Sequence, residues 1–458
     1  MEWKEHRVLV VGLGKSGMAA AGILAGLGAE VVACDKEAKE EREVRWLGDK
    51  GVRLVLGSYP ELEALKPHLV VTSPGVPLWE PPLRTARLLG IPVWGELELA
   101  YRLLPPRSTV IGITGTNGKT TTTALTGQIL KDAGYAVKVV GNIGTPLVAE
   151  AVKASPGWYF VCEVSSFQLE TVELFRPRVA VLLNLTPDHL DRHITWEEYV
   201  RCKARIFAAQ EEDDFAVLNY DDPVVRELRK QTRGRVFFFS RSQRVERGAF
   251  VQGERLYLDL GDGVRYLCGA EELALKGGHN LENALAAAAA AGLVGVSARA
   301  IAHTLKTFKG VPHRLEFVGE IKGVQYINDS KGTNPEATLK ALDAYRQPLI
   351  LIAGGKNKGS DFTLLARKIR ERVKHLILLG EAAPVLWEAA QREGVASVEV
   401  VKDLEEAVRR AHSLAEPGDV VLLSPACASW DMFKNYEERG ELFKRLVRSL
   451  GEGGESHA

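Results

Sequence analysis

The chain has 458 residues, a mass of 50.1 kDa and a balanced charge, with 59 Lys and Arg against 59 Asp and Glu. At about 150 residues per domain, this length predicts roughly three domains. The zero net charge argues against a protein that holds nucleic acid through its overall charge, so we expect no nucleic-acid partner.

The composition also argues against membrane insertion and secretion. No apolar stretch reaches the roughly 18 residues that a membrane span needs, and the N-terminus lacks the apolar region and cleavage site of a signal peptide. The five cysteines are scattered and include no Cys-x-x-Cys pair, which indicates neither a disulfide framework nor a thiolate zinc site. We therefore expect a cytoplasmic protein.

Strands and helices alternate in the first hundred residues. A β-branched run at residues 7–14 ends in glycines, a helix is expected at 15–28, and a second strand at 30–35. This alternation predicts an open, parallel α/β sheet. We place the N-terminal domain at residues 1–104, because the pair Pro105–Pro106 is typical of a linker.

A second α/β unit is expected at residues 105–311. It begins with a strand at 110–114, and its alanine-rich segment at 277–295 reads as a buried helix. Two further segments, 236–242 and 255–260, are expected to be strands of a more antiparallel appendage.

The third α/β unit is expected at residues 312–458. Apolar runs at 324–330, 348–355, 375–380 and 420–426 each end in small or polar residues. Parallel strands of this kind place their following loops, and hence their binding groups, at one edge of the sheet.

The strongest local signal is the glycine-rich loop between the strand at 110–114 and the next helix. Its residues are Gly115, Thr116, Asn117, Gly118, Lys119 and Thr120. Backbone N–H groups of such a loop converge on phosphate oxygens at a helix N-terminus, Lys119 can neutralise phosphate charge, and the Thr120 hydroxyl can reach Mg²⁺. The loop has Ile113 where the usual pattern has glycine, and the motif alone does not separate an ATPase motor, a GTPase, a kinase and a ligase.

A second glycine-rich loop, Gly12–Gly17, follows the first strand, and Asp35 ends the next strand. This spacing is that of a nicotinamide-dinucleotide fingerprint. The loop itself specifies only a diphosphate near a helix N-terminus, with Asp35 near a ribose or base. A nucleotide diphosphate-sugar would satisfy the same groups.

Charged side chains follow two strands of the middle unit. Glu163 at a strand tip beside a phosphate loop is a natural Mg²⁺ ligand, and the loop at 184–193 contains His189, which could bind a second Mg²⁺ or a water. Lys203 lies on a helical segment with an arginine two positions away on either side. Its neighbours predict a solvated surface lysine.

Three loops of the third unit carry cations and hydroxyls at strand ends: Asn328–Pro335, Gly354–Gly359 and Ser424–Ser429. Together with the pair His313–Arg314, they predict a pocket for carboxylate and phosphate groups.

Seven motifs, in order across nearly the whole chain, resemble those of the Mur ligases of peptidoglycan synthesis. They are GTNGKTT, GNIGTP, EVSSFQLE, TPDHLDRH, GGHNLENALAA, GVPHR and INDSKGTNP. The segments VGLGKSG and SPACASWDMFKNYEERGELF are similar to those of the D-glutamate-adding members. The resemblance implies an α/β fold with three domains in series: a Rossmann-like domain for the UDP-linked substrate, a P-loop ATPase-type central domain and a Rossmann-like C-terminal domain for the amino acid. We expect a monomer.

The activity that the resemblance implies is ATP-dependent ligation of D-glutamate to UDP-N-acetylmuramoyl-L-alanine through an acyl-phosphate. Lys119, His189, Lys203 and Lys331 would be the catalytic residues. Besides the phosphate loop, the residues implied for ATP are Thr121, Asn280, Arg314 and Asp329. Two Mg²⁺ ions are implied, one on Thr120 and Glu163 and the other on His189 and Lys203, a lysine that is carbamylated in the family.

The resemblance also implies residues for the two co-substrates. Those for the UDP-linked substrate are Gly14, Lys15, Ser16, Asp35, Lys36, Gly75 and Asn142. Those for D-glutamate are Lys331, Thr333, Lys358, Ser429 and Tyr436, with Lys356 as the alternative to Lys358.

Three other interpretations remain open at this point. The chain could be a related amide ligase, such as a folylpolyglutamate synthase or another Mur member. The first glycine-rich loop could instead belong to an NAD-dependent oxidoreductase, and the phosphate loop to a non-catalytic, nucleotide-dependent scaffold or switch.

Overall fold

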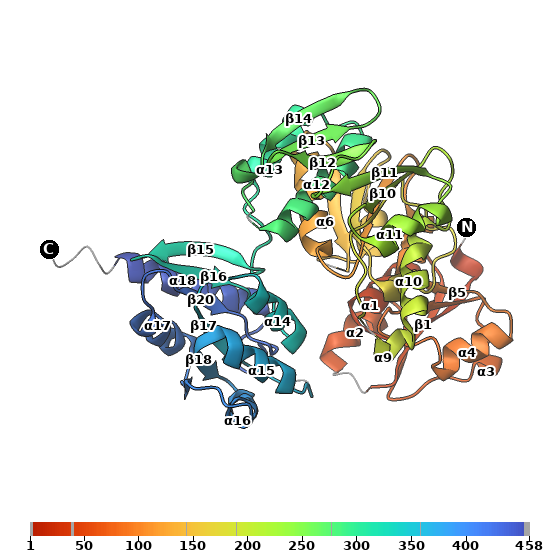
Figure 1. Ribbon diagram of the computed structural model, residues 1–458. Helices are drawn as coiled ribbons and strands as arrows, with labels where there is room; N and C mark the ends of the chain where they lie inside the picture. The colour runs from red at the N-terminus through yellow and green to blue at the C-terminus, as the bar shows by residue number, and fades with distance from the viewer. Residues whose placement is uncertain are drawn as a thin grey trace. The chain divides into compact units, whose positions relative to one another are not determined.

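A parallel sheet with strand order β3-β2-β1-β4-β5 forms the N-terminal part of the computed structural model, which describes residues 3–37, 41–142, 144–188, 190–275, 277–357 and 359–452 (Figure 1). Its strands are β1 (Arg7–Val11), β2 (Glu30–Asp35), β3 (Arg53–Leu56), β4 (Leu69–Thr72) and β5 (Val93–Gly95). Its helices are α1 (Lys15–Gly26), α2 (Glu41–Asp49), α3 (Leu62–Leu65), α4 (Pro81–Leu88) and α5 (Glu96–Leu103). The expected open parallel sheet is confirmed.

The middle sheet has the strand order β14-β13-β12-β11-β10-β9-β6-β8-β7. Its strands are β6 (Thr109–Thr114), β7 (Val137–Gly141), β8 (Tyr159–Glu163), β9 (Val179–Leu182), β10 (Phe215–Asn219), β11 (Arg235–Ser240), β12 (Gly248–Gln252), β13 (Arg255–Asp259) and β14 (Val264–Gly269). Its helices are α6 (Lys119–Asp132), α7 (Leu147–Ala151), α8 (Ser166–Leu169), α9 (Leu190–His193), α10 (Trp196–Ala204), α11 (Pro223–Glu227), α12 (Gly278–Leu293) and α13 (Ala298–Thr307).

The antiparallel part of this sheet is smaller than the sequence predicted. Strand β11 pairs parallel with both β10 and β12, so the prediction that it belongs to an antiparallel appendage was wrong. Only the β12-β13 and β13-β14 pairs are antiparallel among the described strands of this sheet. Buried strands with apolar residues on both faces are typical of parallel pairing, and β11 has that character in its three phenylalanines.

The alanine-rich segment forms α12, as predicted. Residues 284–291 of this helix are all buried against the middle sheet and α6. Alanine has no side chain beyond Cβ, so the helix backbone can approach its neighbours closely.

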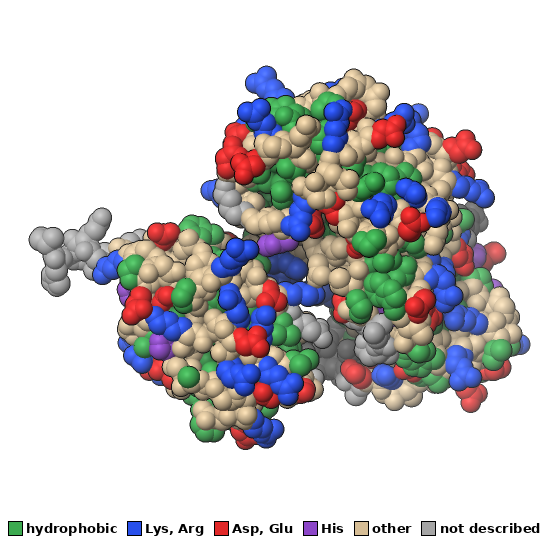
Figure 2. Space-filling view, viewed as in Figure 1, with side chains coloured by type: hydrophobic (Ala, Val, Ile, Leu, Met, Phe, Trp, Pro, Cys, Tyr) green, Lys and Arg blue, Asp and Glu red, His purple; other side chains and the backbone are tan. Residues whose placement is uncertain are grey.

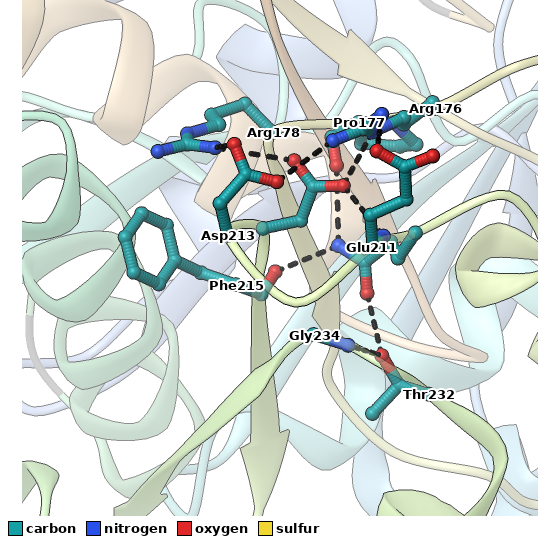
Figure 3. A network of polar contacts seen from close by, with 10 residues as sticks. Arg176, Pro177, Arg178, Glu211, Asp213, Phe215, Thr232 and Gly234 are labelled. Carbon is teal, nitrogen blue, oxygen red and sulfur yellow. Dashed lines mark hydrogen bonds and ion pairs between the residues drawn. The ribbon is translucent and has the colours of Figure 1, made fainter.

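A network of charges joins β9 and β10 at the end of the sheet where these strands begin (Figure 3). Arg176 donates from Nε to the buried carboxylate of Asp214 over 2.5 Å and also pairs with Glu211 and Asp213. The amide of Gln210 donates to the carbonyl oxygens of Pro177 and Phe215. These contacts fix the starts of two core strands relative to each other.

The chain divides into two compact units, one ending at Phe308 and one beginning at Lys309. The second contains a sheet of order β15-β16-β20-β17-β18-β19, in which β15 pairs antiparallel and the other pairs are parallel. Its strands are β15 (Glu316–Ile321), β16 (Val324–Asn328), β17 (Leu349–Gly354), β18 (Val373–Leu379), β19 (Val398–Val400) and β20 (Val420–Leu423). Its helices are α14 (Pro335–Asp343), α15 (Thr363–Arg372), α16 (Ala383–Arg392), α17 (Leu404–Leu414) and α18 (Tyr436–Glu452). In the described part of the chain, no helix is both long enough and apolar enough to cross a membrane.

Candidate functional site

The glycine-rich loop after β6 has the backbone of a phosphate cradle. Gly118 has a φ of 83° directly before α6, and a Cβ atom there would lie 2.3 Å from Oδ1 of Asn283. The ammonium of Lys119 donates to the carbonyl oxygens of Gly115 and Thr116, both at 2.8 Å. The loop therefore holds its lysine over its own backbone, at the N-terminus of a helix where anions are favoured.

A buried carboxylate lies beside this loop. The Thr120 hydroxyl donates to Oε2 of Glu163 over 2.8 Å, and the Asn142 amide donates to Oε1 over 2.9 Å. Thr120 and Glu163 are both buried. Mg²⁺ binds oxygen ligands and takes few of them from the protein, so this hydroxyl and carboxylate suit the ion, and the phosphate loop beside them would supply phosphate oxygens. The described residues contain no group of three or more His, Cys, Asp or Glu side chains that could hold a metal by themselves.

Lys203 is buried, and the expectation of a solvated surface lysine was wrong. Its side chain is 2% exposed, and its ammonium donates to the Thr114 hydroxyl over 3.4 Å and lies 5.0 Å from the ring centre of Tyr199. Tyr199, Cys202 and Lys203 form the inward face of α10, whereas Arg201 is exposed. The polar residues around Lys203 in the sequence therefore belong to a different face of the helix.

Burial and, to a smaller extent, the positive charge of Lys119 lower the pKa of Lys203 to about 7, while Asp188 and Glu163 act in the opposite direction. The lysine thus lies within electrostatic range of the phosphate loop and of the Glu163 carboxylate. His189, predicted beside it for a second Mg²⁺, lies outside the described residues.

Asn283, near the start of α12, lies against Gly118 of the phosphate loop. Asn283 accepts from the Thr122 hydroxyl over 3.1 Å and donates to Oδ1 of Asn280 over 3.3 Å. Asn280 was predicted as an ATP residue, whereas Asn283 was missed. Its side chain is buried against Gly118, and only its spacing of three residues from Asn280 on a helix could have indicated it. Thr121, another predicted ATP residue, is in the first turn of α6.

The N-terminal glycine loop is held by Asp35. This carboxylate accepts from the backbone N–H of Leu13 over 2.8 Å and from that of Glu37 over 3.0 Å. Predicted substrate residues Gly14, Lys15 and Ser16 form the N-cap and first turn of α1, and Lys36 pairs with Glu80 over 3.1 Å. Gly75 lies in the turn after β4, where its carbonyl oxygen accepts from Arg192 over 3.5 Å.

In the second unit, the three predicted loops meet at the C-terminal edge of the sheet. The N–H of Ala426 donates to Gly332, that of Lys356 to Ala428 and that of Gly354 to Pro425. This edge contains the predicted residues Lys331, Thr333, Ser429 and Tyr436, with the Lys331 ammonium 5.9 Å from the Tyr436 ring centre. Lys358 lies outside the described residues, and Lys356 pairs with Glu381 over 3.7 Å.

Two buried charges organise this edge. Asp329 accepts from the Ser424 hydroxyl over 2.7 Å, and burial raises its pKa to about 6 against the opposing effects of that hydrogen bond and of Arg314. Arg439 was missed by the sequence analysis. It donates to the hydroxyl and carbonyl of Ser330 and to the Cys427 carbonyl, and burial lowers its pKa to about 10. No sequence signal distinguishes it from the other arginines of α18.

Models of three related domains match successive parts of the chain between residues 6 and 427. They are the Mur ligase MurD-like N-terminal domain at residues 6–95, the Mur ligase middle domain at 113–291 and the Mur ligase glutamate ligase domain at 313–427.

Relatives and solved structures agree with these matches. The chain is 53% identical to the UDP-N-acetylmuramoylalanine–D-glutamate ligase of Pelotomaculum thermopropionicum over 99% of both chains, and 49% identical to that of Caldanaerobacter subterraneus subsp. tengcongensis over 98% of this chain and 100% of the other. The UDP-N-acetylmuramate-alanine ligase MurC from Thermotoga maritima has the same fold, with a TM-score of 0.57 and 18% identity over 97% of this chain and all of that one.

Proposed function

The chain belongs to the Mur ligase family, and we propose that it is the member that joins D-glutamate to UDP-N-acetylmuramoyl-L-alanine at the expense of ATP. The observation that carries this proposal is the match over 99% of the chain, at 53% identity, to a D-glutamate ligase. This match favours D-glutamate over other amino acids as the amine substrate. The product is a precursor of peptidoglycan. We infer a cytoplasmic location, where ATP is available, and the three domain boundaries and the monomeric state stay predictions.

The proposed reaction has two steps. The alanine carboxylate attacks the γ-phosphorus of ATP, and the bond between this phosphorus and the β–γ bridging oxygen breaks. ADP is released and an acyl-phosphate is formed. The amine of D-glutamate then attacks the acyl carbon, loses a proton, and inorganic phosphate leaves as the amide forms. Both steps move negative charge between oxygens, so the protein contributes by positioning and by fixed positive charge.

We assign the phosphate-side roles to residues of the first unit. Lys119 neutralises the transferred phosphoryl group, and its two backbone contacts hold it in place before the nucleotide arrives. Thr120 and Glu163 would hold Mg²⁺, which would neutralise phosphate charge. The side-chain amide of Asn142 donates to the Glu163 carboxylate, and its side-chain carbonyl oxygen can accept a hydrogen bond from the muramoyl substrate. The D-glutamate residues are those of the second unit's sheet edge, Lys331, Thr333, Ser429 and Tyr436, with Lys358.

We further propose that Lys203 is carbamylated. Burial holds its pKa near neutral, so a large fraction of the amine is uncharged and can attack carbon dioxide, losing a proton as the N–C bond forms. The carbamate would replace a cation with an anionic oxygen ligand for a second Mg²⁺. A carbamate resonance after exchange into ¹³C-bicarbonate, present in the native chain and absent in Lys203→Arg, tests this.

Product formation tests the function directly. Phosphate release is expected with UDP-N-acetylmuramoyl-L-alanine, ATP and D-glutamate together. It should fall to background when L-glutamate, L-alanine or diaminopimelate replaces D-glutamate. Equal release with L-glutamate would contradict the proposal, and release without any amino acid would show hydrolysis of the acyl-phosphate.

A further inference from the structure

A second cavity in the first unit is lined by arginines. It has a volume of about 570 Å³ and lies between α4 of the N-terminal sheet and α10 of the middle sheet. Its arginines are Arg84, Arg87, Arg192, Arg201 and Arg205, and we call the cavity the arginine groove. Figure 2 shows basic side chains on the face that carries these two helices. None of the residues assigned above to ATP, Mg²⁺ or the substrates is among its described lining residues.

The positive charge of the groove is only partly neutralised. Glu170 is held by Arg192 through two hydrogen bonds of 3.1 and 2.6 Å, and Glu198 lies 3.6 Å from Arg201. These are the two carboxylates among the described lining residues, against five arginines. The described residues give Arg84 and Arg87 no acidic partner, so the groove keeps three uncompensated positive charges.

The two walls present these charges in pairs. Arg84 and Arg87 are three positions apart on α4 and both are exposed, whereas Arg201 lies on α10 and Arg205, four positions later, is the residue that caps its C-terminus. Residues at these spacings are neighbours on a helix surface. Guanidinium groups bind phosphate oxygens in a bidentate way, so the two walls can hold two phosphate groups or one diphosphate between them.

The groove also has an apolar part. Trp79 is 52% exposed and Ile194 is 74% exposed, although both are large apolar residues. Trp79 lies at the cavity lining with the Arg192 guanidinium 5.7 Å from its ring centre. A flat ring stacked at this position would cover apolar surface that is otherwise in water.

We propose that the arginine groove binds a small phosphorylated molecule that carries a flat ring, as a site separate from the ATP and substrate sites. Its volume is within the range of pockets that bury small ligands. The phosphates lie between the two arginine pairs, and the ring lies against Trp79 and Ile194.

Arginine modification by phenylglyoxal, followed by peptide mass spectrometry, reports on each arginine separately. Inorganic pyrophosphate and ADP are the probes, and Arg233, which is exposed and outside the groove, is the internal reference. At ten times its dissociation constant a probe leaves about one site in eleven free, so modification of Arg84 and Arg201 should slow about tenfold. ADP should do so at a lower concentration than pyrophosphate because of its ring.

Three outcomes would overturn the proposal. They are no slowing at Arg84 and Arg201, equal slowing at Arg233, which would indicate general ionic screening, and slowing only by phosphatidylglycerol vesicles, which would indicate a membrane surface. The variant Arg87→Ser/Arg205→Ser should lose the protection of Arg84. The matched control Arg255→Ser/Arg299→Ser, with the same charge change elsewhere, should keep it. If Arg87→Ser/Arg205→Ser does not fold, the modification rates of Arg84 and Arg201 in the native chain still test the proposal.

Discussion

Burying Lys203 costs folding free energy that a substitution should recover. The side chain is buried and its pKa is lowered from 10.5 to about 7. Methionine has a similar volume and needs no charge solvation. We therefore expect Lys203→Met to unfold at a higher denaturant concentration than the native chain at neutral pH, although it should not form product.

The size of this effect follows from the pKa. Below the folded-state value both states carry the proton and the cost of the buried charge is complete, whereas above the unfolded-state value both are neutral and the cost disappears. With values of 7 and 10.5, the cost is about 4 kcal/mol at pH 7 and about 1 kcal/mol at pH 10. The stability advantage of Lys203→Met over the native chain should therefore shrink as the pH rises from 7 to 10.

Urea unfolding of both chains between pH 7 and pH 10 measures this difference. Carbon dioxide is removed from the buffers so that the amine stays unmodified, and Lys153→Met, at an exposed lysine, is the matched control. A gap that stays constant across the pH range, or a variant less stable than the native chain at pH 7, would refute the argument.

Three further substitutions test the site and the fold. Lys119→Ala should abolish phosphate release while leaving the circular dichroism spectrum unchanged, because the Lys119 ammonium donates to the carbonyl oxygens of Gly115 and Thr116 in its own loop. Glu163→Gln keeps the shape of the side chain but removes its charge, so the Mg²⁺ concentration for half-maximal activity should rise at least about tenfold. An unchanged concentration would show that Glu163 is not a Mg²⁺ ligand. Arg176→Ala leaves the carboxylate of Asp214 buried without its shortest partner, and unfolding free energy should fall by about 1–3 kcal/mol in chemical denaturation.

Local patterns predicted the fold class and the phosphate loop because short-range sequence determines both. The alternation of β-branched runs with helices requires parallel pairing, and the loop glycines, Lys119 and Thr120 are adjacent in sequence. The resemblance to a family extended this to Asn142, which is distant in sequence from the loop and which the structure places, together with Thr120, on the Glu163 carboxylate.

The errors about Lys203 and Arg439 share a cause, which is that the burial of a side chain depends on tertiary packing. Arginines beside Lys203 in the sequence suggested a solvated helix, but the side chains that face the core come from other positions on the same turn. Arg439 was missed for the same reason, since a buried arginine bonded to loop carbonyls has no local signature.

Lys119 and Lys203 are coupled, and the coupling gives a prediction for the carbamate. The charge of Lys119 helps to lower the pKa of Lys203, which raises the fraction of neutral amine that can react with carbon dioxide. Once the carbamate forms, the Lys203 side chain carries a negative charge instead of a positive one, so the ammonium of Lys119 attracts it. Both effects disappear in Lys119→Ala, and we expect this variant to show a weaker ¹³C-carbamate resonance than the native chain at equal bicarbonate and pH. Full carbamate occupancy in Lys119→Ala would mean that burial alone sets the reactivity of Lys203, and that the phosphate loop and this lysine titrate independently.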